Sequence, residues 1–169
     1  MTSFRGRIKA RILDAPSIHR ALNRMAHQIL ERNPNLDDIE LIGIGERGTL
    51  LARRLANIFR SLEGRTIPAG ILEGTGSERH ESTSKQKTIV LVDAVIFTGR
   101  AAHRAIASIL AHEPVECIQL AVLVDRGNRE VPVHADYVGK SVPTAADEYV
   151  EVRLKELDNE EQVVIMEKS

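Results

Sequence analysis

The chain has 169 residues, a formal net charge of −1 at pH 7, 43% hydrophobic residues and 28% charged residues. This composition predicts one globular domain and excludes a mainly disordered chain. The near-zero charge argues against nucleic-acid binding through bulk charge, and the 3% aromatic content argues against a base-stacking sheet. Because Cys117 is the single cysteine, a disulfide framework and a Cys-based zinc site are excluded. No apolar run is long enough to span a bilayer and no signal-peptide pattern is found, so we expect a cytoplasmic protein.

Apolar runs alternate with helical patterns along the chain, which predicts an α/β fold with a mostly parallel sheet. The first helix is expected to begin after Asp14, a good N-cap, and to run to residue 33. Its apolar stripe consists of Ile18, Leu22, Met25 and Ile29. The pattern further predicts strands at residues 39–43, 66–72, 88–93 and 117–124, helices at 49–62 and 98–112, and a hairpin of residues 149–154 and 162–166 around Asp158-Asn159.

Two further segments are polar. Residues 1–11 carry basic side chains at alternate positions 5, 7, 9 and 11, which favours an edge strand with a solvated face, with a basic arm as the alternative. Residues 73–87 contain two glycines and several hydroxyl side chains, and are expected to form a flexible loop.

The most informative segment comprises residues 89–100, with the sequence IVLVDAVIFTGR. An apolar strand ends at Asp93, a short loop follows, and a helix opens at Thr98 and Gly99. Ligands of open α/β sheets bind beyond the carboxyl ends of the strands, and the start of a helix favours an anion. The segment therefore indicates a phosphate site, with a ligand-free strand-to-helix turn as the alternative.

This segment resembles the phosphoribosyl-diphosphate (PRPP) signature of type I phosphoribosyltransferases. Together with residues 20–27 (RALNRMAH), 119–130 (QLAVLVDRGNRE) and 136–140 (DYVGK), it resembles most closely the PyrR family of pyrimidine-operon regulators. The resemblance implies a single type I phosphoribosyltransferase domain over residues 1–169, with a mostly parallel sheet flanked by helices, a small hood and a C-terminal hairpin. It also implies uracil phosphoribosyltransferase activity, Mg²⁺ only where PRPP is bound, and a homodimer or higher homo-oligomer.

By the same resemblance, PRPP or a pyrimidine nucleotide such as UMP would be bound by Arg47, Asp93, Thr98, Gly99, Arg100, Ala101, Ala102, Asp125 and Arg126. The chain departs from the family pattern at four places. Ala94 stands where the signature has a second acid for the ribose hydroxyls, and Ala101 where it has a threonine. Glu46 places a negative charge in the diphosphate loop of residues 45–48, and the loop at 73–87 is shortened. These departures predict weak or absent transferase activity, with no confident catalytic residue.

Leader-RNA binding is also implied by the resemblance. The matching positions are Arg20, Asn23, Arg24, His27, Arg32, Arg129 and Lys140. Arg20, Arg24 and His27 share one helical face opposite the apolar stripe. The alternative is a solvated helix face with scattered basic residues.

Three functional hypotheses follow from these observations. The first is a PyrR-like regulator that binds a nucleotide and leader mRNA, with its transferase activity weak or lost. The second is a working uracil phosphoribosyltransferase that converts uracil and PRPP to UMP and pyrophosphate. The third is a pseudoenzyme that acts as a regulatory subunit through protein contacts.

Overall fold

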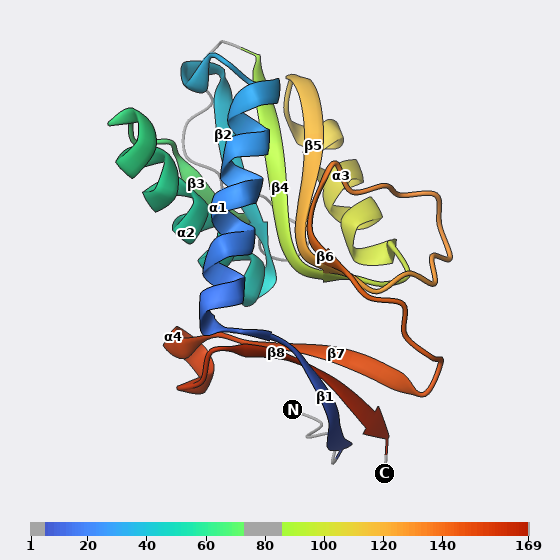
Figure 1. Ribbon diagram of the computed structural model, residues 1–169. Helices are drawn as coiled ribbons and strands as arrows, with labels where there is room; N and C mark the ends of the chain where they lie inside the picture. Colours follow the sequence, from blue (N-terminus) through green and yellow to red (C-terminus); the bar gives the residue numbers. More distant parts are fainter. Residues whose placement is uncertain (1–5, 73–85, 169) are drawn as a thin grey trace.

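The computed structural model describes residues 6–72 and 86–168, and within them the chain forms two sheets and the helices that flank them (Figure 1). The elements in chain order are β1 (Gly6–Asp14), α1 (Ala15–Arg32), the 3₁₀ turn η1 (Leu36–Asp38), β2 (Ile39–Ile44), α2 (Gly45–Glu63), β3 (Ala69–Leu72), β4 (Lys87–Ile96), α3 (Arg100–His112), β5 (Val115–Asp125), β6 (Tyr137–Ser141), β7 (Glu148–Arg153), α4 (Lys155–Asp158) and β8 (Gln162–Lys168).

The larger sheet has the strand order β3-β2-β4-β5-β6, and all of its described pairs are parallel. Helices α1 and α2 cover one face and α3 covers the other, so the side chains of β4 enter two separate apolar clusters. Val90 and Val92 belong to the cluster under α1 and α2, whereas Ile89 and Leu91 belong to the cluster under α3. Burial on both faces explains why this strand is a continuous apolar run. The predicted α/β class is confirmed.

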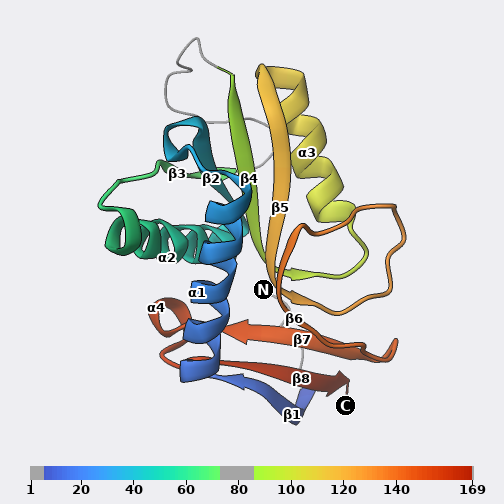
Figure 2. The same ribbon diagram turned by 45° about the horizontal axis from the view of Figure 1, so that its top comes forward.

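The smaller sheet is antiparallel, with the order β1-β8-β7, and lies below the carboxyl ends of the parallel strands (Figures 1 and 2). We call this sheet, with α4, the hood. The expected C-terminal hairpin is confirmed, since Val152 of β7 pairs with Val163 of β8. The basic N-terminal segment forms an edge strand in its described part, and its Lys9 is paired with Glu148 and Glu167. These ion pairs give a structural reason for the basic side chain at position 9 of this strand.

The apolar stripe of α1 lies where its spacing predicted. Ile18, Leu22, Met25 and Ile29 are buried, and the Asp14 side chain caps the helix by accepting a hydrogen bond from the Ser17 amide at 2.9 Å. None of the helices in the described ranges is long and apolar enough to cross a membrane.

Several predicted boundaries were wrong. Helix α2 begins at Gly45 and not at residue 49, so residues 45–48 form its first turn and not a loop. No side chain caps this end of α2, and the sequence therefore lacks the usual start signal. Strand β4 continues to Ile96, so that Asp93 lies within the strand, and α3 starts at Arg100. Most of the predicted loop at 73–87 lies outside the described residues.

The first turn of α2 lies directly on β4. A Cβ atom added at Gly48 would be 2.4 Å from the carbonyl oxygen of Val92, which is far closer than van der Waals contact. We predict that Gly48→Ala lowers the free energy of unfolding by about 1–3 kcal/mol, the range for overpacking a tight contact. Urea unfolding measures this loss. Gly70→Ala is the control, because a Cβ there meets nothing within 4 Å, and an equal loss in both variants would contradict the prediction.

Candidate functional site

A cavity of about 510 Å³ separates the hood from the carboxyl end of β4. It is lined by Ile44, Gly45, Glu46, Arg47, Asp93, Ala94, Val95, Val150, Glu151 and Val152. Its walls therefore come from the first turn of α2, from β4 and from β7. We call it the large cavity; it contains two of the residues predicted to hold PRPP, Arg47 and Asp93.

A second cavity of about 110 Å³ lies beside it, at the start of α3. We call it the small cavity; its lining residues are Asp93, Val95, Ile96, Phe97, Thr98, Gly99, Ala101, Ala102, Leu120 and Val122. The structure thus brings together Thr98, Gly99, Ala101 and Ala102 as predicted. The first-turn amides of a helix have no acceptor within the helix, and the N-cap residue of α3, Gly99, has no side chain to bind them. The Arg100 amide donates to Thr98 Oγ1 at 3.2 Å, and the amides that follow it suit an anion.

Gly99 has a structural role in this turn. Its φ angle is +84°, a conformation that favours glycine, and an added Cβ would be 3.1 Å from Val131 Cγ2. The loop that contains Val131 is fastened there by hydrogen bonds from the Glu130 and Val131 amides to the Thr98 carbonyl, at 2.9 and 3.2 Å. The predicted signature turn is therefore fixed by the loop after β5. Arg100 pairs with Glu130 at 2.6 Å and is not among the residues lining the small cavity.

Asp93 lies at the boundary of the two cavities and lines both. Burial among apolar strand residues raises the pKa of Asp93 to about 7, and a 2.7 Å hydrogen bond from the Ala94 amide only partly offsets this. A carboxyl group with a pKa near neutrality can donate or accept hydrogen bonds at physiological pH. A shifted acid in a cleft is typical of a ligand site.

Ala94 marks the main departure from the family signature. Its side chain is 6% exposed and joins the apolar cluster that includes Val92 and, from the hood, Val152 and Leu154. An acid here would be buried against apolar groups of the hood. The second carboxylate of the family signature is thus replaced in this chain by the Ala94 methyl group, which lines the large cavity.

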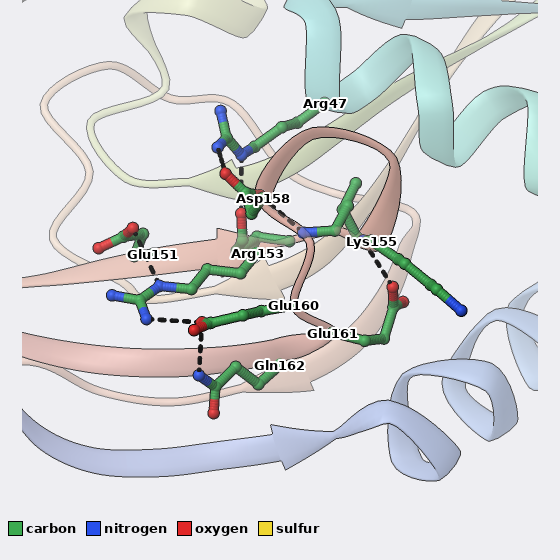
Figure 3. Close-up of polar contacts among 10 residues, drawn as sticks. Arg47, Glu151, Arg153, Lys155, Asp158, Glu160, Glu161 and Gln162 are labelled. Carbon is green, nitrogen blue, oxygen red and sulfur yellow. Dashed lines mark hydrogen bonds and ion pairs between the residues drawn. The ribbon is translucent and has the colours of Figure 1, made fainter.

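Arg47 is held by the hood. Its Nε donates to the Val152 carbonyl at 2.7 Å and its Nη2 to Asp158 Oδ1 at 2.8 Å (Figure 3). The predicted diphosphate residue therefore forms an ion pair within the protein. Exposed Glu46 beside it and Glu151 opposite it add two carboxylates to the same cavity.

The end of β5 and the loop after it contain three further predicted residues, Asp125, Arg126 and Arg129. Arg129 donates to both carboxylate oxygens of Asp125 at 3.0 and 2.8 Å, and to the carbonyls of Phe97 and Val133. Although burial acts to raise the pKa of Asp125, the Arg129 guanidinium and the Gly127 amide lower it below its ordinary value. The donors of Arg129, predicted to contact RNA, are thus engaged in holding this loop.

Arg126 is buried, with 4% of its surface exposed. Its guanidinium lies 3.8 Å from the centre of the Phe97 ring and donates to Thr144 Oγ1 at 2.8 Å and to the Glu148 carbonyl at 2.7 Å. The Arg126 side chain therefore links Phe97, in the turn that follows β4, to the hood. Because the Phe97 side chain is 40% exposed and lines the small cavity, it offers a planar apolar surface there.

The basic residues predicted on α1 are exposed and lie beside β6. Arg24 donates to the Gly139 carbonyl, next to Lys140, and Arg32 pairs with Asp136 at 2.7 Å. Arg20 and His27 are the remaining exposed members of this surface. We call these residues with Lys140 the α1–β6 surface. Asn23, predicted with them, instead lines a pocket between α1 and α2 with Arg54 and Asn57. The structure brings Lys140 to the α1 residues, while Arg129 is engaged elsewhere.

Metal-ligating side chains do not cluster in the described part of the chain: no three His, Cys, Asp or Glu residues there form a group able to hold a metal ion.

Solved structures similar to this fold include phosphoribosyltransferases. The hypoxanthine-guanine phosphoribosyltransferase of Leishmania tarentolae, in complex with GMP, superposes with a TM-score of 0.78 at 17% identity and covers 96% of this chain and 98% of its own. The hypoxanthine phosphoribosyltransferase of Trypanosoma cruzi, in complex with IMP, gives a TM-score of 0.73 at 14% identity, covering 99% and 93%. The phosphoribosyl transferase domain model matches residues 9–157. The fold and this match therefore define a phosphoribosyltransferase domain.

Sequence relatives narrow this class. The chain is 47% identical to the bifunctional protein PyrR of Pelotomaculum thermopropionicum, over 95% of this chain and 97% of that protein. It is 41% identical to the bifunctional protein PyrR of Clostridium acetobutylicum, over 95% and 98%. The chain belongs to the PyrR family of phosphoribosyltransferase domains.

Three residues of the site were not predicted from the sequence: Phe97, Val152 and Asp158. Phe97 is an apolar residue beside the signature and carries no polar signal. Val152 acts through its carbonyl, which every residue has, and Asp158 was interpreted only as part of a hairpin turn. Val152 and Asp158 are more than 100 residues from Arg47 in the chain, and contacts over such separations leave no local sequence pattern.

The pKa of Asp93 predicts a pH-dependent stability. The group has a pKa of about 7 in the folded protein and near 3.8 in the unfolded chain, so its stabilising contribution is complete below about pH 4 and is lost as the pH rises through 7. Asp93→Asn should remove this loss. Between pH 5 and 8 the wild type should lose roughly 2–3 kcal/mol relative to the variant, since one pKa unit corresponds to about 1.4 kcal/mol.

Urea unfolding at both pH values measures the difference. The exposed Asp147→Asn is the matched control and should follow the wild type. Parallel pH profiles for wild type and Asp93→Asn would contradict the assignment of a neutral-range pKa to this group.

Proposed function

We propose that the protein is a regulator of pyrimidine biosynthesis that binds a pyrimidine nucleotide, with UMP as the expected ligand, and the leader RNA of a pyrimidine operon. Its uracil phosphoribosyltransferase activity is weak or lost. One contrast carries the proposal. The small cavity keeps the features of a phosphate cradle. The large cavity has a carboxylate at Glu46, a second at Glu151 that pairs with Arg153, an Arg47 that is already paired, and no acid at Ala94.

Nucleotide binding would use the small cavity and its rim. The first-turn amides of α3 and the Thr98 hydroxyl would donate to the 5′-phosphate, and the helix dipole favours its charge. Asp93 would bind a ribose hydroxyl. The base would lie toward Phe97, which lines the cavity, and toward the backbone at Arg126, whose amide donates to the carbonyl of the lining residue Ile96 at 3.1 Å.

Transfer itself makes further demands. Uracil N1 must form a bond to the anomeric carbon, the bond from that carbon to diphosphate oxygen must break, and uracil must lose a proton. Mg²⁺ bound with PRPP supplies positive charge to the leaving diphosphate. In this chain the ribose has one carboxylate partner in place of two, and loss of one charge-assisted hydrogen bond typically costs about 1.5–3 kcal/mol.

A working transferase is the second candidate, favoured by the 47% identity to a protein named bifunctional. UMP formation from uracil and PRPP at an enzyme-like rate would establish it. A rate near background would leave the regulator proposal as the better account.

A thermal shift experiment tests the proposed ligand. UMP should raise the unfolding temperature, by the equivalent of about 2.7 kcal/mol at a hundredfold excess over its dissociation constant, and orthophosphate should have a smaller effect. PRPP with Mg²⁺ should stabilise less than UMP at equal concentration. No shift with UMP would contradict the proposal and favour a role through protein contacts.

RNA binding through the α1–β6 surface predicts a distinct pattern of mutant effects. Arg24→Ala and Lys140→Ala should each weaken leader-RNA binding about 3- to 10-fold and reduce the salt dependence by about one counterion, because each removes a candidate phosphate contact. Filter binding across salt concentrations measures both quantities.

Two controls separate this surface from other basic residues. Arg65→Ala removes an exposed arginine paired with Asp37 elsewhere and should leave RNA affinity unchanged. Arg129→Ala should lower stability by about 1–3 kcal/mol and leave the salt dependence unaltered, since its donors hold Asp125. Failure of the wild type to bind its leader RNA, with and without UMP, would refute this part of the proposal.

A further inference from the structure

The turn of the hood hairpin, residues 154–161, is strongly acidic and is bound to α2 by two arginines. Arg54 donates to both carboxylate oxygens of Glu161 and to those of Glu156, and this pairing raises its pKa. Arg47, two turns earlier on α2, makes the contacts to Val152 and Asp158 already described. The turn is therefore fixed to α2 at two points.

Asp158 is held in place independently of Arg47. Its Oδ2 accepts the Leu154 amide at 2.8 Å, and Asn159 follows in the left-handed conformation with a φ of +57°. The Lys155 amide donates to Glu161 at 2.9 Å and closes the same turn (Figure 3). The carboxylate thus presents its second oxygen, Oδ1, to Arg47 from a preformed turn.

Arg47 is the only basic side chain that lines the large cavity as the structure describes it. Two of its three guanidinium nitrogens donate to the hood, and its charge is matched by Asp158 at 2.8 Å. The pair carries no net charge. Glu151 pairs with Arg153 at 3.1 Å, so no free cation of the described lining is left to face the exposed Glu46 or an incoming anion.

We propose that Asp158 is a specificity-determining residue: by pairing with Arg47 it lowers the affinity of the large cavity for a diphosphate and leaves monophosphate binding in the small cavity unaffected. The inference rests on the proposed function in that it takes the two cavities to be the nucleotide site. A diphosphate needs a cation or several donors at its second phosphate. Asp158 neutralises the charge of Arg47 and accepts from its Nη2, while the Val152 carbonyl accepts from its Nε. The small cavity includes neither residue.

Asp158→Asn tests this directly with inorganic pyrophosphate as the probe. The amide oxygen can still accept the Leu154 amide, while the charge opposite Arg47 is lost. We expect pyrophosphate to bind about fivefold more tightly than to the wild type in calorimetry at fixed Mg²⁺, a modest gain because the Arg47 side chain is 39% exposed and the pair is partly screened. UMP affinity should change by less than twofold.

Glu160→Gln is the matched control. Glu160 lies on the same turn and pairs with Arg153 at 2.8 Å, so the variant removes the same charge without touching Arg47. Its pyrophosphate affinity should stay within twofold of the wild type. A gain in Glu160→Gln equal to that in Asp158→Asn would mean a general charge effect and would overturn the assignment.

A double variant tests the same ion pair from the side of Arg47. Arg47→Ala with Asp158→Asn removes the neutral pair, and pyrophosphate binding should stay within twofold of the wild type. A tenfold loss would show that Arg47 binds diphosphate while paired, and would overturn the proposal, as would unchanged or weaker binding in Asp158→Asn. Failure of UMP to bind the wild type would instead refute the proposed nucleotide site.

Discussion

The first turn of α2 touches the backbone of β4, and most of the site depends on this contact. Because Gly48 has no side chain, the helix approaches the Val92 carbonyl closely and places the neighbouring Arg47 at the edge of the large cavity. The same approach brings the α2 turn, Asp93 and the hood around one space. A larger residue at position 48 would move α2 and open this arrangement.

Many basic side chains of the protein form ion pairs with its own carboxylates. Arg47 and Arg54 fasten the hood turn to α2, Lys9 joins β1 to β7 and β8, and Arg129 holds the loop after β5. In a chain whose net charge is −1, this leaves the α1–β6 surface as the group of exposed basic residues best suited to a phosphate backbone. The two ends of the candidate site differ for the same reason: the small cavity relies on backbone amides and a helix dipole, and the large cavity has its cation neutralised.

The fold was predictable in outline because burial on both faces makes parallel strands into apolar runs, as in β4 and β5. The stripe of α1 and the hairpin of β7 and β8 were predicted for equally local reasons. The predicted start of α2, residue 49, lies four residues after the observed one, Gly45, because no side chain caps this helix. Strand β6 was not predicted, because its segment is too short to be identified from its own sequence. Its burial beside β5 and under α1 gives β6 its stability, and that is a tertiary contact.

The sequence by itself determined the turn proposed to hold a phosphate, since Thr98 and Gly99 lie between a strand and a helix that begins at the next residue, and the backbone geometry of this turn is local. The sequence also shows that Ala94 replaces the second acid and that Glu46 adds a negative charge. Both facts depend on which residue occupies a position and not on how the chain folds. Only the tertiary structure decided what the arginines do. Arg47 meets Asp158, 111 residues away, and Arg126 lies on Phe97 and reaches into the hood. A guanidinium binds whichever carboxylate or carbonyl the folded chain places within about 3 Å, and no sequence spacing records that choice.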